Sequence, residues 1–237
     1  MAGSRLLETL KKSIPTISVG MLTADLMALG PQIRLLEQTE VTMLHFDVMD
    51  GVFCPIMTFG PPLIKAVKTP LFKDVHLMII EPLEKIKDYV AAGADIISVH
   101  AESSVHIHRI LQELGKMSNQ NDPERGLIRG VALNPGTPIE ALEPLLDEVE
   151  MVTLLAINPG WGGQQFIPST RQRVQKVRRL ISESAKEILV CVDGGVTREN
   201  ITEVAGLGAD IIVTGSAVFD GKAPVENAAY MLTALKK

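Results

Sequence analysis

The sequence predicts an α/β protein, a single (β/α)8 TIM barrel preceded by a short helix. Short apolar segments alternate with amphipathic ones along the whole chain, which indicates parallel strands connected by helices. The strand-like segments are nearly continuous apolar runs, as expected of strands buried on both faces. Gly-Ala-Asp-Ile-Ile at 93–97 recurs at 208–212, which indicates a half-barrel repeat. An open doubly wound sheet is the competing architecture, but its Gly-x-Gly-x-x-Gly turn after the first strand is absent.

The first half of the chain is expected to supply the leading helix and four strand–helix units. Leucines among charged residues at 4–12 indicate a short amphipathic helix. Thr23 and Asp25 are suitable N-terminal caps for the helix after the first strand, and Pro82 suits the first turn of a later helix. We expect strands at 14–20, 41–47, 72–79 and 95–100, and helices after them at 23–38, 61–67, 82–92 and 105–116.

The second half repeats the alternation after a polar stretch at 117–126, which we expect to be an exposed, mobile loop without a chemical role. Because the alternation resumes at once, this loop is not a domain linker, and residues 1–237 are expected to form one catalytic domain. A glycine-rich loop at 158–168 follows the sixth strand. We expect strands at 128–134, 151–157, 188–193 and 210–215, and helices at 138–148, 169–185, 198–206 and 224–236.

Composition and charge exclude several classes of partner. The net charge of −5 and the lack of a dense Lys/Arg cluster argue against nucleic acid. No apolar run approaches the ~18 residues that span a bilayer, so we expect no membrane association. The start of the chain lacks the unbroken apolar centre of a signal peptide. Cys54 and Cys191 have no paired spacing, so we expect reduced thiols in a cytoplasmic protein.

The strand at 41–47 carries an unusual pair of polar side chains. His45 and Asp47 are two residues apart, so on a strand they point to the same face. Burying an imidazole and a carboxylate together costs free energy unless a charged partner compensates for it. A metal ion is the simplest such partner.

Polar residues at other strand ends complete this site. In barrels of this class the active site lies at the carboxyl ends of the strands. There His76 and Asp193 join His45 and Asp47, and two His with two Asp suit a divalent zinc, iron(II), manganese or cobalt ion. His76 alone would more often be a satisfied core residue, so the joint placement carries the prediction. His100 also ends a strand but lacks a partner at matched spacing, so we expect a supporting or structural role.

Three glycine-rich loops at the same end of the barrel indicate a phosphate-binding site. Backbone N–H groups of such loops can approach an anion closely, and a following helix N-terminus favours its charge. The loops after strands seven and eight often hold a phosphate in these barrels, and the loop after strand six could close over the same end. The candidate residues are Gly160, Trp161, Gly162, Gly163, Gly194, Gly195, Gly215 and Ser216.

The predicted site combines two carboxylates, a metal site and a phosphate-binding site. This combination indicates an enzyme that transfers a proton at a carbon next to a carbonyl. A metal would stabilise enediolate oxygens as a Lewis acid. Asp47 and Asp193, on opposite sides of the substrate, could remove a proton from one face and return one to the other. That is the arrangement of an epimerase. Metal-assisted isomerisation and aldol cleavage need similar parts, so these residues alone define only the reaction class.

Five motifs spread over the chain are specific in combination. They are His-Phe-Asp-Val-Met-Asp-Gly at 45–51, Asp-Val-His-Leu-Met at 74–78, Asn-Pro-Gly-Trp-Gly-Gly-Gln at 158–164, Val-Asp-Gly-Gly-Val at 192–196 and Gly-Ser-Ala at 215–217. On these motifs the chain resembles the ribulose-phosphate 3-epimerase family. The resemblance implies an isomerase of the pentose phosphate pathway that interconverts D-ribulose 5-phosphate and D-xylulose 5-phosphate.

The resemblance also implies roles for individual residues. The metal ligands would be His45, Asp47, His76 and Asp193, of which Asp47 and Asp193 are also the acid and base. His76 and the residues of the three glycine-rich loops would contact the sugar phosphate. Met49 and Met78 match a methionine-rich cap over the reacting carbons.

The chain departs from the family pattern around the substrate. The family usually has Pro-Ser-Ile-Leu-Ser-Ala-Asp at the end of strand one, where its first Ser touches substrate, but Gly20 stands at that position. Ser18, one step deeper on the same strand face, is the candidate to replace this hydroxyl. Ile56 and Leu155 replace a usual Asn and a common third Met.

These departures leave two alternatives open. The substrate could be a hexulose 6-phosphate such as allulose 6-phosphate, or the barrel could bind a sugar phosphate without turning it over. In either case we expect a homo-oligomer that assembles through outer helices, with the helix at 4–12 as a candidate contact.

Overall fold

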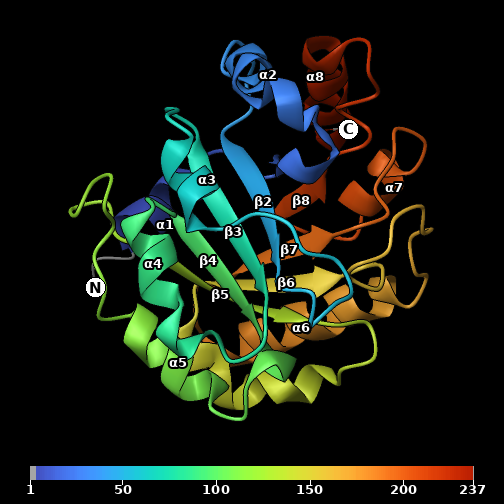
Figure 1. The fold of residues 1–237 in the computed structure, drawn as a ribbon. Helices are drawn as coiled ribbons and strands as arrows, with labels where there is room; N and C mark the ends of the chain where they lie inside the picture. The colour runs from blue at the N-terminus through green and yellow to red at the C-terminus, as the bar shows by residue number, and fades with distance from the viewer. Residues whose placement is uncertain (1–3, 237) are drawn as a thin grey trace.

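In a computed structural model that describes residues 4–236, eight parallel strands form a closed barrel surrounded by helices (Figure 1). Each strand pairs with its neighbour in the sequence, and the first pairs with the last, which closes the sheet on itself. The predicted fold class is therefore confirmed. The strands are β1 (Thr16–Gly20), β2 (Met43–Met49), β3 (Phe72–Met78), β4 (Ile96–His100), β5 (Ile128–Leu133), β6 (Met151–Leu155), β7 (Leu189–Asp193) and β8 (Ile211–Thr214).

The helices follow the strands in the predicted order, and several short 3₁₀ turns accompany them. The α-helices are α1 (Ser4–Lys11), α2 (Leu29–Leu36), α3 (Pro61–Ala66), α4 (Ile86–Ala91), α5 (Ile107–Leu114), α6 (Thr170–Ser184), α7 (Ile201–Ala205) and α8 (Pro224–Leu235). The 3₁₀ segments are η1 (Met21–Thr23), η2 (Leu26–Ala28), η3 (Pro82–Glu84), η4 (Ala101–Ser103) and η5 (Ile139–Glu148).

Three of these segments differ from the prediction for local reasons. Asp25 does act as a cap, but its side chain accepts the Met27 N–H at the start of η2, and α2 begins only afterwards. Pro82 opens the short turn η3 ahead of α4. The fifth unit has the 3₁₀ helix η5 instead of an α-helix, and it contains Pro144. Proline lacks an N–H and its ring clashes with a preceding carbonyl, which disfavours a regular α-helix there.

Strand side chains divide between two cores according to the face on which they lie. Outward-facing residues such as Val19 and Phe46 pack beneath the helices. Inward-facing residues such as Met43, Ile96 and Met151 fill the amino-terminal end of the barrel. This division follows from the period of two along each strand. It leaves the inward positions at the carboxyl end for polar groups.

The helix α1 closes the amino-terminal end of the barrel. Leu6, Leu7 and Leu10 are buried, and they belong to the same cluster as the inward-facing strand residues. The Leu6 N–H also donates to the Arg125 carbonyl at 2.9 Å. The apolar face of α1 is therefore covered by its own barrel, and the expectation that it contacts another copy is wrong for that face.

The polar stretch at 117–126 is largely exposed or half-buried, as predicted for a surface loop, but several of its side chains anchor it to the barrel. Asn119 is fully buried, and its side-chain amide donates to Asp95 at 2.9 Å and to the Gly126 carbonyl at 2.8 Å. Arg125 forms an ion pair with the same carboxylate. Asp95 immediately precedes β4, so the stretch is held against the amino-terminal end of the barrel.

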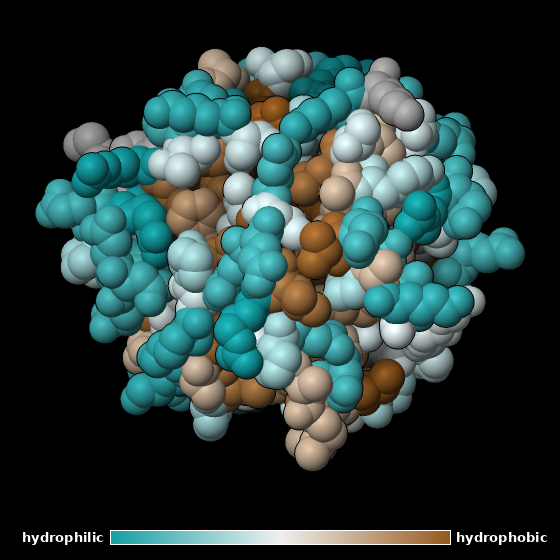
Figure 2. Space-filling view, turned by 90° about the horizontal axis from the view of Figure 1, so that it is seen from above, coloured by the Kyte–Doolittle hydropathy of each residue, from teal (hydrophilic) through white to brown (hydrophobic). Residues whose placement is uncertain are grey.

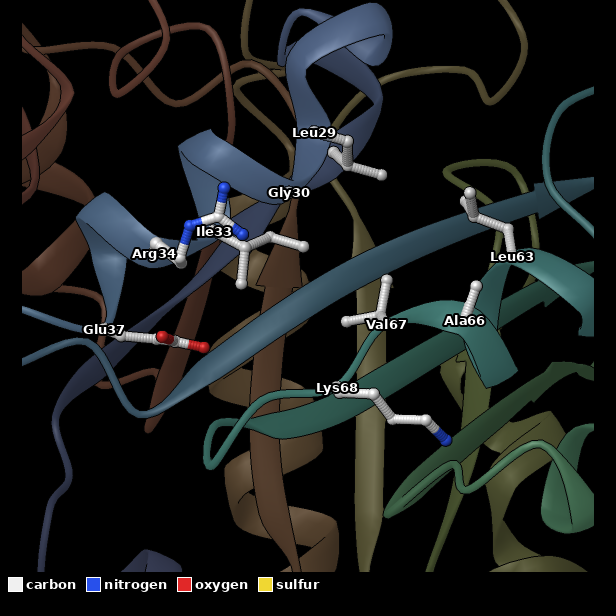
Figure 3. A pocket seen from close by; sticks show the side chains of 9 residues that line it. All are labelled: Leu29, Gly30, Ile33, Arg34, Glu37, Leu63, Ala66, Val67 and Lys68. Atoms are coloured by element: carbon white, nitrogen blue, oxygen red, sulfur yellow. The ribbon is translucent and has the colours of Figure 1, made fainter.

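The face of the molecule seen from above is largely hydrophilic, with hydrophobic residues visible between the hydrophilic ones (Figure 2). One open groove lies between α2 and α3, where Leu29 and Ile33 face Leu63 and Val67 (Figure 3). This groove is on the outside of the barrel, away from the interior end where the polar strand residues meet. Within residues 4–236, no helix has both the length and the apolar character needed to cross a membrane.

Candidate metal centre

Four polar side chains meet inside the barrel at the carboxyl ends of three strands. His45 and Asp47 come from β2, His76 from β3 and Asp193 from the end of β7. One possible ligand atom from each lies within 4.8 Å of the others. His76 Nδ1 is 3.2 Å from Asp193 Oδ2, and His45 Nε2 is 3.4 Å from Asp47 Oδ1. The structure thus brings together the same four residues that the sequence singled out.

The strand register explains this convergence. His45 and Asp47 both point inward because of the two-residue period. The parallel pairing of β2 with β3 places His76 opposite Asp47. Asp193 reaches the cluster from β7, and its carboxylate lies 3.7 Å from His45 Nε2.

Two unpartnered nitrogen atoms indicate what this cluster can hold. His45 Nε2 and His76 Nδ1 are buried and have no hydrogen-bond partner among the described residues. Both face the carboxylates of Asp47 and Asp193. Two imidazole lone pairs and two carboxylates form a donor set that suits a divalent first-row metal. The residues present therefore fit a metal ion.

The opposite nitrogen of His45 is held by a buried carboxylate. His45 Nδ1 lies 2.7 Å from Asp74 Oδ2, and the Ser18 hydroxyl donates to the same oxygen at 2.9 Å. Such a carboxylate keeps the proton on Nδ1 and the lone pair on Nε2. The Ser18 hydroxyl is thus engaged beneath the cluster, so the expectation that it replaces the missing hydroxyl at Gly20 is wrong.

The cluster is strongly polarised even without a metal. Burial lowers the pKa of His45, but the carboxylates of Asp74 and Asp47 outweigh it and raise that pKa well above its ordinary value. Burial also lowers the pKa of His76, but the nearby carboxylates of Asp193 and Asp47 outweigh it and raise that pKa. For Asp47 burial raises the pKa, but the two histidines more than reverse this and lower it. Protons and a metal would therefore compete for the same lone pairs.

His100 has a partner that the sequence prediction overlooked. Its Nε2 lies 2.9 Å from His76 Nε2, and its Nδ1 lies 3.0 Å from Glu102 Oε2. Burial lowers the pKa of His100 to about 4. For Glu102 burial raises the pKa, but bonds from His100 and from Thr137 outweigh it and lower that pKa to about 2. The expectation that His100 lacks a partner at matched spacing is wrong, because Glu102 follows it at the same interval that separates His45 from Asp47.

The glycine-rich loops lie at the same end of the barrel as the four-residue cluster. At some of their positions a larger residue would clash with neighbouring atoms, so close packing requires glycine there. Gly160 has a φ of 92°, and a Cβ there would lie 2.7 Å from the Cβ of Cys54 in the loop after β2. Gln164 ties the loop together by donating to the carbonyls of Asn158 and Trp161 at 2.6 and 2.7 Å. The Trp161 side chain is exposed.

The next glycine pair follows the candidate ligand Asp193 directly. Gly194 has a φ of 98°, a left-handed conformation that side chains disfavour, and a Cβ there would lie 2.3 Å from Ile157. The main chain can therefore turn sharply at the end of β7, against the loop that follows β6. The neighbouring strand β8 pairs with β7, and Gly215 and Ser216 follow directly after its last residue.

A small apolar group includes the strand residues two positions beyond Asp47 and His76. Met49 and Met78, at the ends of β2 and β3, are buried with Cys54, and Leu22 and Phe53 pack against them. Leu155 is buried at the end of β6, and Ile56 is exposed in the loop after β2. The two methionines predicted as a cap therefore lie together near the cluster.

Comparisons with known proteins identify relatives of this chain. Residues 16–219 match the model of the ribulose-phosphate 3 epimerase family. The chain is 42% identical over 206 residues to ribulose-phosphate 3-epimerase of Bacillus subtilis, covering 86% of this chain and 91% of that protein. It is 40% identical over 225 residues to the chloroplastic ribulose-5-phosphate-3-epimerase of Arabidopsis thaliana, covering 93% and 77%.

A solved structure of an enzyme named for a different activity shares the fold. The 3-hexulose-6-phosphate synthase of Salmonella typhimurium superposes with a TM-score of 0.67 at 18% identity, over 93% of this chain and 98% of that one. This similarity supports the barrel architecture alone. The matched family model and the identities to the two epimerases go further, and they show that the chain belongs to the ribulose-phosphate 3-epimerase family.

Proposed function

We propose that this chain is a metal-dependent epimerase that interconverts D-ribulose 5-phosphate and D-xylulose 5-phosphate, and that residues 1–237 form one catalytic domain. The observation that carries the proposal is the cluster of His45, Asp47, His76 and Asp193 at the carboxyl end of the barrel. Family membership supports the same activity. The cluster places two carboxylates on strands from different sides of a narrow barrel.

The two carboxylates have complementary tasks in this proposal. Asp47, as a carboxylate, removes the C3 proton from one face of the ketose phosphate. Asp193, in its protonated form, donates a proton to C3 from the other face. The reverse reaction uses the same residues with their tasks exchanged. A bound divalent metal would supply Lewis-acid stabilisation of the negative charge on the enediolate oxygens.

The four cluster residues are the proposed metal ligands. Nε2 of His45 and Nδ1 of His76 are the nitrogen donors, since these atoms have no other partner among the described residues. Zinc, iron(II), manganese and cobalt all accept such a mixed set of nitrogen and oxygen donors. We keep all four as candidates for the native ion.

The glycine-rich loops are the proposed binding site for the sugar phosphate. Backbone N–H groups after β7 and β8 suit the phosphate, because this part of the barrel commonly holds one. The loop after β6 and the His76 ring would border the rest of the substrate. The proposed contacts are His76, Gly160, Trp161, Gly162, Gly163, Gly194, Gly195, Gly215 and Ser216.

The end of β1 favours a hexulose 6-phosphate as a second candidate substrate. Gly20 at the end of β1 offers no hydroxyl, and Ser18 is engaged by Asp74 beneath the cluster. The contact that the family usually makes from this strand is therefore missing, which leaves a hexulose 6-phosphate as the second candidate.

Two further proposals concern the state of the protein in the cell. Both cysteines are unpaired and buried among the described residues, which agrees with a reducing compartment, and we propose a cytoplasmic protein. We also propose a homo-oligomer, which would use helices other than the apolar face of α1.

A panel of pentulose and hexulose phosphates tests this function. We expect the highest kcat/KM for D-ribulose 5-phosphate, loss of turnover after metal removal by a chelator, and recovery when a divalent metal is restored. A higher kcat/KM for a hexulose 6-phosphate would move the assignment to the second substrate. Failure to turn over any ketose phosphate in the presence of metal would indicate a binding protein instead.

A further inference from the structure

A chain of polar groups, two buried imidazoles and a carboxylate, holds the outer nitrogen of His76. Its Nε2 lies 2.9 Å from Nε2 of His100, and the planes of the two rings are 18° apart. On the far side, Nδ1 of His100 lies 3.0 Å from Oε2 of Glu102. Both imidazoles are fully buried. The chain thus runs from the metal centre through two rings to a carboxylate, and none of its outer members takes part in the proposed proton transfer.

One arrangement of protons satisfies this chain when His76 serves as a metal ligand. Nδ1 of His76 must then offer a free lone pair, so the neutral ring carries its proton on Nε2. That N–H can donate to His100 only if Nε2 of His100 is unprotonated. The His100 proton therefore lies on Nδ1, from which it is donated to Glu102.

The loop after β5 holds the carboxylate at the end of this chain. Oε1 of Glu102 accepts the Asn134 N–H at 2.8 Å and the hydroxyl of Thr137. Arg173, from α6, donates to the carbonyls of Thr137 and Asn134 at 2.6 and 2.9 Å. Both oxygens of Glu102 are thus engaged, one by His100 and one by the loop.

We propose that Glu102, acting through His100, is a positioning residue for His76 and links the loop after β5 to the metal centre. The inference rests on the metal-dependent function proposed above. A carboxylate behind a ligand histidine fixes the tautomer and orientation of the ring and raises its basicity. Here a second imidazole lies between the carboxylate and the ligand, so Glu102 on one loop controls a ligand on a neighbouring strand.

Zinc affinity tests this positioning role. After metal removal, zinc is titrated against a chromophoric chelator for the wild type, Glu102→Gln and His100→Phe. Glutamine has the same size as glutamate, but one of its two oxygens is replaced by an NH₂ group. That group cannot accept the hydrogen bond that His100 or the loop after β5 donates to Glu102. Phenylalanine removes the acceptor for the His76 N–H. We expect each variant to bind zinc at least about tenfold more weakly, the loss typical of removing such a partner.

Glu150→Gln is the matched control. Glu150 is also a partly buried glutamate that accepts a backbone N–H, that of Arg129 at 2.9 Å, together with side-chain donors. It immediately precedes β6, at the opposite end of the barrel. We expect this variant to keep wild-type zinc affinity even if its stability falls.

The position of the His100 proton provides a second measurement, made on the wild type. Long-range ¹H–¹⁵N NMR of the zinc-loaded protein should show His100 protonated on Nδ1 and His76 on Nε2. A wild type that binds no zinc would overturn the proposed function and this inference with it. A wild type that binds zinc while both variants bind it equally well overturns the inference alone, as does a His100 proton on Nε2.

Discussion

His45 and Asp74 form a buried pair beneath the metal centre, with His45 Nδ1 2.7 Å from Asp74 Oδ2. The two residues lie opposite each other in the parallel pairing of β2 with β3. Asp74 is 1% exposed and also accepts the Ser18 hydroxyl. Because the carboxylate keeps the proton on Nδ1, it turns the Nε2 lone pair of His45 toward the carboxylates at the barrel mouth.

Replacing Asp74 by Asn should weaken metal binding. The neutral amide is a poorer acceptor for the His45 N–H, so we expect zinc affinity to fall by about 10–100-fold, measured by chelator competition. Asp95→Asn is the control, because Asp95 is equally buried but lies at the amino-terminal end of the barrel. It should lower stability and leave zinc affinity unchanged. Equal zinc affinities for Asp74→Asn and the wild type would argue against the role of Asp74.

Metal binding should strengthen as the pH rises. In the metal-free protein the pKa values of His45 and His76 are raised, so protons occupy the lone pairs that a metal needs. These raised pKa values stabilise the metal-free fold at low pH, and that contribution is lost as the pH rises through them. The increase in Tm caused by saturating zinc should therefore grow as the pH rises above about 6.5, the ordinary pKa of histidine. A pH-independent increase would contradict competition between protons and metal.

Gly20→Ser should improve activity on the pentulose phosphate. A Cβ at Gly20 would lie 3.4 Å from Gly215 Cα, a contact that a small shift relieves. One added hydrogen bond contributes about 0.5–1.5 kcal/mol, so we expect kcat/KM for D-ribulose 5-phosphate to rise roughly 2–10-fold. Gly20→Ala, which adds the carbon without the hydroxyl, should give no gain. Equal effects of Ser and Ala would show that the hydroxyl contacts nothing on the substrate.

Leu10→Ala should destabilise the barrel from its closed end. Leu10 is fully buried against the inward-facing strand residues, so truncation leaves a cavity and should cost about 2–5 kcal/mol of unfolding free energy. Urea denaturation measures this loss. Leu26→Ala is the control, since Leu26 is 48% exposed, and it should change the unfolding free energy by no more than about 0.5 kcal/mol. Similar losses in both variants would mean that α1 does not plug the barrel.

The barrel and the four-residue cluster could be predicted because both depend on simple periodicities. Strand–helix alternation defines the parallel barrel, and the two-residue period of a strand puts His45 and Asp47 on one face. Strand ends then bring His76 and Asp193 to the same place. These inferences need only the order of the strands.

The supporting contacts could not be predicted in the same way, because they depend on side chains that meet across strands. The bond between Ser18 and Asp74 joins β1 to β3, and it corrects the role expected for Ser18. The plugging role of α1 requires knowledge of where the chain enters the barrel. Glu102 is different, since its spacing from His100 was visible in the sequence and indicated a pair.

Deuterium exchange at C3 tests the two-base account most directly. Zinc-loaded wild-type protein, incubated with D-xylulose 5-phosphate in D₂O, should introduce deuterium at C3 as product forms, because in this direction Asp193 is the residue that removes the C3 proton. Zinc-saturated Asp193→Asn should slow exchange by about 10²–10⁴-fold, the usual contribution of a positioned acid or base. Metal content is measured alongside, so that loss of the ion is not mistaken for loss of the catalytic base. Exchange at the wild-type rate in metal-loaded Asp193→Asn would contradict the assignment of Asp193.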